Sequence, residues 1–251
     1  MLKRCALVVF VAAAAAPAVA VDDGWSEAAK TDVAGRALTV YSRARVGSEV
    51  REVMGKGSFE APPWVIKNVI DDVGRYHEFM PYTAKSTVES TGDGFIVSYQ
   101  RLAVPLADDR DYTIKIFDES QEDAAGKVVW KNRWTTNGVK GGPAPVDGVV
   151  RIAVNEGYWQ LEDLDGGKHT KVTYYVYTSP GGAMPAFLVN AANTQAVPDL
   201  FKAVAKASSD PRYQKTKPTP RTTEKKAEAA PTNSTTASSP TAPTTPAAVT
   251  P

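Results

Sequence analysis

The segment that decides the fold, residues 172–206, reads VTYYVYTSPGGAMPAFLVNAANTQAVPDLFKAVAK. Its opening VTYYVYT is rich in β-branched and aromatic residues, which is typical of a strand. The SPGG that follows is a turn signal. From Met184 onward, apolar residues recur at three- and four-residue spacing, which predicts an amphipathic helix of about six turns. The segment therefore predicts a strand, a tight turn and a long closing helix.

Two features distinguish this predicted helix from an ordinary packing helix. Its middle carries alanines instead of leucines, and Pro198 removes an amide donor from it. We interpret it as a lid over a cavity, with residues 187–196 lining the cavity and residues 200–205 anchoring the helix to a sheet. The expected lining stripe is Phe187, Leu188, Ala191, Ala192 and Gln195. Alanines also allow a helix to approach a sheet closely, and that alternative stays open.

The amino terminus has the pattern of a secretory signal over residues 1–20. Lys3 and Arg4 precede an apolar run, which ends in the small-residue triplet Ala18, Val19 and Ala20. This predicts an exported protein, periplasmic or secreted. The single cysteine, Cys5, lies inside the signal, so the mature chain would have no disulfide.

Composition divides the remaining chain into two parts. Residues 21–213 are long enough for one domain with a sizeable core. Residues 214–251 are dominated by Pro, Thr, Ser and Ala, which predicts a disordered tail. Removing Lys3 and Arg4 leaves 27 basic residues (29 minus 2) against 28 acidic ones, a charge of minus one. This balance gives no strong field for nucleic acid, and we expect no nucleic-acid partner.

The rest of the chain predicts mainly strands. Residues 25–34 and 62–74 are expected to be helices, the second beginning at Pro62 and Pro63. Short linkers between the predicted strands favour antiparallel pairing and hence an α+β fold with helices on one face of a curved sheet. The predicted strands span residues 38–45, 49–60, 84–90, 95–102, 111–119, 128–137, 149–155, 158–163 and 170–178.

Four motifs in this order resemble the START lipid-transfer family, within the Bet v 1-like helix-grip superfamily. They are VIDDVGRYHEFMPY (69–82), PLADDRDY (105–112), DGVVR with GYW shortly after it (147–159), and the segment from VTYYVYT to VPDLFKAV (172–204). The resemblance covers about residues 25–208. It implies a sheet of seven to nine strands that grips the carboxy-terminal helix, with a hydrophobic tunnel that holds one lipid between them.

Several residues outside the helix are candidate ligand contacts. Arg110 shares a strand face with Tyr112, so we expect it to point inward and to orient a polar head group. A surface ion pair with neighbouring aspartates is the alternative. Tyr99, Trp134 and Trp159 are expected to line the tunnel. The alternative is that such large aromatic side chains simply fill an ordinary core. Val104 and Leu106 would form an apolar tunnel entrance that touches a membrane transiently.

No pattern of a catalytic or metal site stands out in the sequence. The two histidines, His77 and His169, are too few for a zinc site, and we expect no metal, no cofactor and no catalytic residue. The leading hypothesis is a monomeric carrier that binds a lipid or another hydrophobic small molecule and is not an enzyme. The alternatives are a cyclase or aromatase acting on a bulky apolar substrate in the same cavity, and an envelope scaffold whose tail recruits a partner.

Overall fold

The computed structural model describes residues 23–103, 107–182 and 184–220. The predicted signal at residues 1–20, the predicted entrance residues Val104 and Leu106, and the predicted tail beyond residue 220 lie outside these ranges. The beginning of that tail, residues 214–220, is described. There the Asn68 Nδ2 donates to the Thr216 carbonyl over 2.8 Å.

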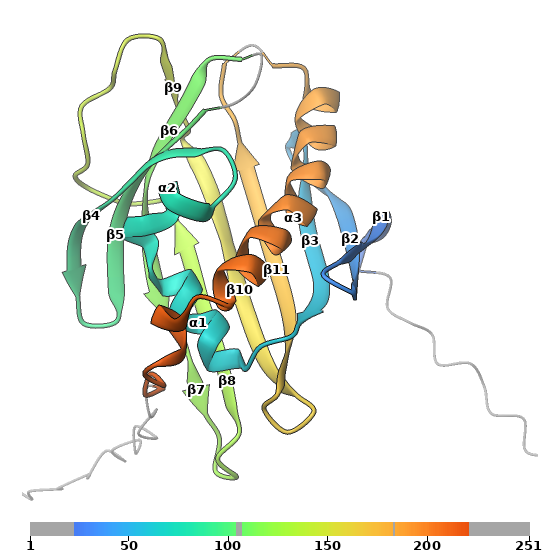
Figure 1. The fold of residues 1–251 in the computed structure, drawn as a ribbon. Coiled ribbons are helices and arrows are strands. Elements are labelled where there is room, and N and C mark those ends of the chain that lie inside the picture. The colour runs from blue at the N-terminus through green and yellow to red at the C-terminus, as the bar shows by residue number, and fades with distance from the viewer. Residues whose placement is uncertain (1–22, 104–106, 183, 221–251) are drawn as a thin grey trace, which may run out of the picture.

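The described residues form a large, curved and mainly antiparallel sheet (Figure 1). Its continuous path runs in the order β1-β2-β3-β11-β10-β8-β6-β5-β4, with β7 paired to β8 and β9 paired to β6. The strands are β1 (Ser26–Val33), β2 (Arg36–Arg45), β3 (Ser48–Phe59), β4 (Thr83–Gly92), β5 (Phe95–Leu102), β6 (Asp109–Asp118), β7 (Gln121–Glu122), β8 (Val128–Thr135), β9 (Val149–Arg151), β10 (Val154–Leu164) and β11 (His169–Ser179).

The helices lie on one face of this sheet, and the longest crosses it diagonally (Figure 1). They are α1 (Pro63–Asp71), η1 (Val73–Arg75), α2 (Tyr76–Phe79), α3 (Ala186–Ser208) and η2 (Pro211–Gln214). Pro63 begins α1, as predicted, because its missing amide hydrogen has no partner in the first turn of a helix. The predicted α+β helix-grip fold, a curved sheet around a long carboxy-terminal helix, is confirmed.

The prediction of a helix at residues 25–34 is wrong. The segment forms β1, which pairs with β2 through a two-residue turn at Ala34 and Gly35. Both turn residues have positive φ, 52° and 78°, which is the backbone geometry of a tight hairpin. Pairing along β2 satisfies the backbone of β1, and this outweighs the weak helix preference of its alanines.

The prediction of one antiparallel strand at residues 149–155 is also wrong. The chain forms the short strand β9, leaves the sheet, and returns at Val154 to start β10. Strand β9 runs parallel to β6, with Arg110 opposite Val150. The backbone N–H of Ile152 donates to the Asp111 carbonyl over 2.8 Å, which holds the chain at the crossing.

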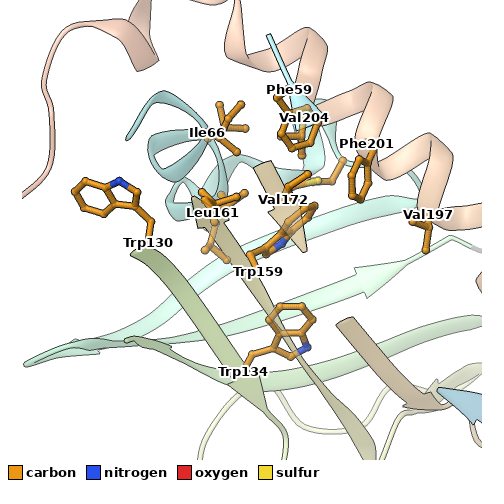
Figure 2. Close-up of a cluster of buried hydrophobic side chains, with 14 of the residues drawn as sticks. Phe59, Ile66, Trp130, Trp134, Trp159, Leu161, Val172, Val197, Phe201 and Val204 are labelled. Atoms are coloured by element: carbon orange, nitrogen blue, oxygen red, sulfur yellow. The ribbon is translucent and has the colours of Figure 1, made fainter. Parts of the chain in front are cut away.

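The core lies between α1, the carboxy-terminal half of α3 and the middle of the sheet (Figure 2). Phe201 on α3 is 1% exposed, and its ring centre lies 5.2 Å from that of Phe59 and 5.7 Å from that of Trp159. Ile66 and Ile70 on α1, and Val73 at the start of η1, are fully buried. This packing fixes α3 against the sheet at one end.

A glycine in β3 lets α3 approach the sheet closely. A Cβ atom on Gly55 would lie 2.8 Å from Val197 Cγ1, closer than Cβ atoms approach their neighbours in proteins, and 3.2 Å from Phe201 Cε2, a tight contact. The sequence Gly55-Lys56-Gly57-Ser58 therefore has a packing role, in which the absent side chain makes room for the helix.

Candidate ligand-binding cavity

A cavity of about 250 Å³ lies between the inner face of the sheet and α3. Strands β5, β6, β8, β10 and β11 contribute its floor, and α1, the turn after α2 and α3 contribute its cover. Most of its wall is apolar or aromatic, including Ile114, Ile116, Trp134, Trp159, Tyr174, Val176, Val197 and Leu200. Its mainly apolar wall is typical of small-molecule sites in proteins, and its volume lies just below their usual range.

The wall also carries polar side chains, and each described lining residue is uncharged at neutral pH. The polar ones with side-chain amides are Gln100, Asn132, Asn155 and Asn193. Two of these amides are held by aromatic donors. The Tyr112 hydroxyl donates to Gln100 Oε1 over 2.7 Å, and Trp134 Nε1 donates to Asn155 Oδ1 over 2.9 Å.

Two cavity tyrosines, Tyr112 and Tyr174, are neutral. Burial raises the pKa of Tyr112 and of Tyr174 well above the usual value of 10, because an ionised phenolate would lose its hydration. Their hydroxyls can therefore donate and accept hydrogen bonds but are poor proton donors in acid–base chemistry.

Trp134 and Trp159 lie in the cavity wall, as the sequence predicted. Both pack on Tyr174, with ring centres 5.9 Å and 4.5 Å from it. Figure 2 shows the two indoles on neighbouring strands below α3. Their contact with a ligand stays a prediction, and their position makes them natural fluorescent reporters of the cavity.

The predicted inner stripe of α3 is wrong. Its five members, Phe187, Leu188, Ala191, Ala192 and Gln195, are all exposed, and none of them lines the cavity. Phe187 is 70% exposed and Leu188 is 48% exposed. The inner face instead carries Asn193, Ala196, Val197 and Leu200, which do line the cavity.

Asn190 explains this rotation of the helix. Its Oδ1 accepts from the backbone N–H of Arg51 over 2.8 Å, and its Nδ2 donates to the Glu49 carbonyl over 3.1 Å. Both partners lie at the start of β3, so Asn190 turns its own side of α3 toward the sheet. Large apolar side chains on the other side remain exposed as a result.

Tyr99 is buried but does not line the cavity, so its predicted position is wrong. Strand side chains alternate between faces, and Gln100 is the inward residue because it pairs with Tyr112 across β5 and β6. The Tyr99 hydroxyl donates to Asp111 Oδ2 over 3.0 Å on the opposite face. Arg151 donates to the same carboxylate over 2.5 and 2.9 Å. The cluster of Tyr99, Asp111 and Arg151 is therefore structural. Gln100 lines the cavity and was not predicted from the sequence as a lining residue.

Arg110 is 5% exposed, so the alternative of a surface ion pair is wrong. Its Nη1 donates to the Asp108 carbonyl, and its Nη2 lies 2.7 Å from Met184 Sδ. Among residues 23–103, 107–182 and 184–220, no carboxylate pairs with it, and its Nε has no hydrogen-bond partner. Arg110 lies beyond the cavity, opposite Leu102, which is the last lining residue of β5. A head-group contact there stays a prediction.

The turn after α2 meets α3 at the rim of the cavity. Tyr82 lines the cavity, is 44% exposed and has a positive φ of 61°, which is strained for a bulky residue. Its hydroxyl donates to Asp199 Oδ2 over 3.3 Å. This weak contact joins the turn to the helix at the rim of the cavity.

The described part of the chain shows neither a metal centre nor a membrane-spanning helix. It contains no cluster of three or more His, Cys, Asp or Glu side chains placed to hold a metal ion. None of its helices combines the length and the apolar character that a membrane span requires.

Comparisons with known proteins agree with this architecture. The family described as polyketide cyclase / dehydrase and lipid transport matches residues 59–205. The phosphatidylcholine transfer protein of Rattus norvegicus is 26% identical over 172 residues, covering 68% of this chain and 78% of that protein.

Solved structures give the same picture. A STAR-related lipid transfer protein from Xanthomonas axonopodis is 26% identical, with a TM-score of 0.61, covering 74% of this chain and 99% of that one. Human StAR-related lipid transfer protein 5 is 17% identical, with a TM-score of 0.63, covering 74% of this chain and 87% of that one, and supports the fold alone. The chain belongs to the polyketide cyclase / dehydrase and lipid transport family, and its predicted place among the START lipid-transfer proteins is confirmed.

Proposed function

We propose that this protein binds one lipid in the cavity beneath α3 and carries it between membranes of the cell envelope without chemical change. The observation that carries the proposal is the cavity itself, which combines an apolar wall with a few uncharged polar groups. Transfer of apolar surface from water into such a wall gains about 25 cal/mol per Å². Binding alone can therefore stabilise the complex, and no bond needs to break.

Delivery requires contact with a membrane, and the amino-terminal end of α3 suits this role. Phe187 and Leu188 are large apolar side chains that face solvent. Their exposure, which contradicts a lining role, supports transient contact with lipid at this end of the helix. The opening to the cavity would then form where the turn around Tyr82 meets α3.

Export is the second part of the proposal and rests on the signal pattern at residues 1–20. Expression of the full chain followed by cell fractionation tests it. We expect a mature protein that begins near residue 21 outside the cytoplasm. An uncleaved chain in the cytoplasm would contradict export and leave lipid binding intact.

The binding function is tested by extracting the purified mature protein with organic solvent and analysing the extract by mass spectrometry. We expect one co-purified lipid class, and faster exchange of that class between labelled donor and acceptor vesicles. Protein that is empty after purification and accelerates no exchange would contradict the proposal. Size-exclusion chromatography of the same sample tests the expected monomer.

A cyclase or aromatase is the second candidate, because the family description includes cyclases and dehydrases. Such an enzyme would need its acid and base among the uncharged side chains of the wall, and the hydroxyls of Tyr112 and Tyr174 are two of those available. Replacing each by Phe separates the two functions. Lipid exchange by a carrier would change only modestly, whereas turnover of a polyketide substrate would collapse.

A further inference from the structure

The cavity excludes charge although charged side chains lie close behind its wall. Lys67, on α1, is such a cation, and its side chain is 2% exposed. Its ammonium lies 2.5 Å from Asp71 Oδ2 and 3.2 Å from Asp118 Oδ2, so both neighbours already balance it. A phosphate or carboxylate at this end of the cavity would lose its hydration and meet no free cation.

One polar atom in the same place lacks a partner. Asn132 lines the cavity, is 3% exposed, and donates from Nδ2 to Asp71 Oδ1 over 2.7 Å. An ionised carboxylate only accepts hydrogen bonds, so this contact fixes which arm of the amide is nitrogen and which is oxygen. Within the described ranges, the buried Oδ1 has no hydrogen-bond donor. An occupant with an O–H or N–H group would supply one.

The side-chain oxygens of the other two buried amides in the wall already have hydrogen-bond donors. Gln100 Oε1 already accepts from Tyr112, and Asn155 Oδ1 already accepts from Trp134. Of these three buried amide oxygens, only that of Asn132 is left without a donor. The acceptor lies at the α1 end of the cavity, because Asp71 is the last residue of α1.

We propose that the ligand is a neutral lipid whose hydroxyl or amide N–H donates to Asn132 Oδ1 at the α1 end of the cavity. Its apolar part then lies along Ile116, Trp159 and Val197 toward the rim. This chemistry fits fatty alcohols, mono- and diacylglycerols, hydroxylated polycyclic lipids and fatty amides that carry an N–H. It disfavours free fatty acids and phospholipids, whose charged heads would replace hydration by an uncharged wall. The inference rests on the proposed function and names the ligand class of the same site.

A panel of three probes, each built on a twelve-carbon chain, tests the head-group chemistry on the full mature protein. The probes are 1-dodecanol, dodecyl methyl ether and dodecanoate, and binding is followed by the fluorescence of Trp134 and Trp159. Dodecanol can donate a hydrogen bond, the ether can only accept one, and dodecanoate is charged. We expect dodecanol to bind up to about tenfold more tightly than the ether, the equivalent of one net hydrogen bond, and dodecanoate to bind weakest.

A matched pair of variants assigns the effect to one atom. Asn132→Leu should reduce the preference for dodecanol over the ether to about one, a loss of up to about tenfold. Asn193→Leu makes the same change on α3, across the cavity, and should keep the preference. Thermal unfolding of each variant establishes that it folds. If Asn132→Leu does not fold, the test rests on the affinities of the unchanged protein for dodecanol and for the ether. Tighter binding of dodecanol supports the proposed ligand class, and equal binding overturns it.

The outcomes separate the two proposals. Equal binding of alcohol and ether overturns the ligand class and leaves lipid binding in place. Tightest binding of dodecanoate that is lost in Arg110→Met also overturns it, because the head would then lie at Arg110. Failure of all three probes, together with an empty solvent extract, would overturn the proposed function itself.

Discussion

The two halves of α3 are one continuous helix, yet they contact the sheet in different ways. Beyond Pro198, large apolar residues face inward, and Phe201 and Val204 are 1% and 0% exposed. Before Pro198, the largest apolar residues face solvent. The inward residues there are smaller or polar: Val189, Asn193, Ala196 and Val197. The comparison teaches that a helix above a cavity needs small or polar residues inward, whereas a helix above a core needs large ones.

The strongest test of this contrast removes a large side chain from each half. Phe201→Ala should lower the free energy of unfolding by about 3–5 kcal/mol, because it leaves a hole beside Phe59 and Trp159. Leu188→Ala, on the exposed side of the first half, should change it by less than about 0.5 kcal/mol. Urea denaturation measures both. Similar losses in the two variants would mean that both halves are anchored alike.

The second test fills the space under the first half. Ala196 lines the cavity, so Ala196→Trp should weaken lipid uptake on the order of a hundredfold, about 2.7 kcal/mol, by occupying the ligand volume. Ala192→Trp, one turn away on the exposed side, is the matched control and should bind lipid normally. Vesicle exchange and tryptophan fluorescence read out both. Loss of lipid uptake in the Ala192 variant alone would support the lining role that the sequence predicted for Ala192.

The third test removes the close approach of helix and sheet. Gly55→Ala places a methyl group 2.8 Å from Val197 Cγ1 and should cost about 1–3 kcal/mol of unfolding free energy. Gly74→Ala is the matched control, because its nearest contact is Val88 Cγ2 at an ordinary 3.6 Å. A Gly55 variant as stable as its control would show that the helix can shift away from the sheet freely.

The smallest expected effect concerns the rim. Tyr82→Phe removes the 3.3 Å hydrogen bond to Asp199 and should change stability by less than about 1 kcal/mol, because the pair is exposed. We expect lipid release to accelerate by less than about tenfold. Stopped-flow transfer to acceptor vesicles measures it. An unchanged rate of lipid release would indicate that the cavity opens at another place.

Local patterns predicted most elements of the fold. Strand β5 occupies residues 95–102, as predicted, because its apolar and aromatic run lies between clear turn signals. The long helix and its anchoring half were also predicted, since periodicity identifies an amphipathic helix directly. The wrong predictions concern segments whose structure depends on the strand with which they pair. Residues 25–34 became a strand because β2 pairs with them.

The site was less predictable than the fold. The rotation of α3 depends on Asn190 and its bonds to backbone groups of β3, which lie about 140 residues earlier in the chain. Gln100 lines the cavity in place of the predicted Tyr99, because the pairing of β5 with β6 determines which face of β5 points inward. The contact between Asn132 and Asp71 depends on where α1 crosses the sheet. No local pattern carries any of these three facts.

The position of β11 in the sheet also determines the order in which the chain can fold. Strand β11 lies between β3 and β10, and it joins the amino-terminal strands to the rest of the sheet by pairings such as Val53 with Val176. Contacts so distant in sequence close late, because a long loop must first lose its freedom, and they slow folding. Until β11 arrives, β3 and β10 each present an unpaired edge that can capture other chains. A chain cut before His169 would therefore be expected to aggregate, even though most of its strands are present.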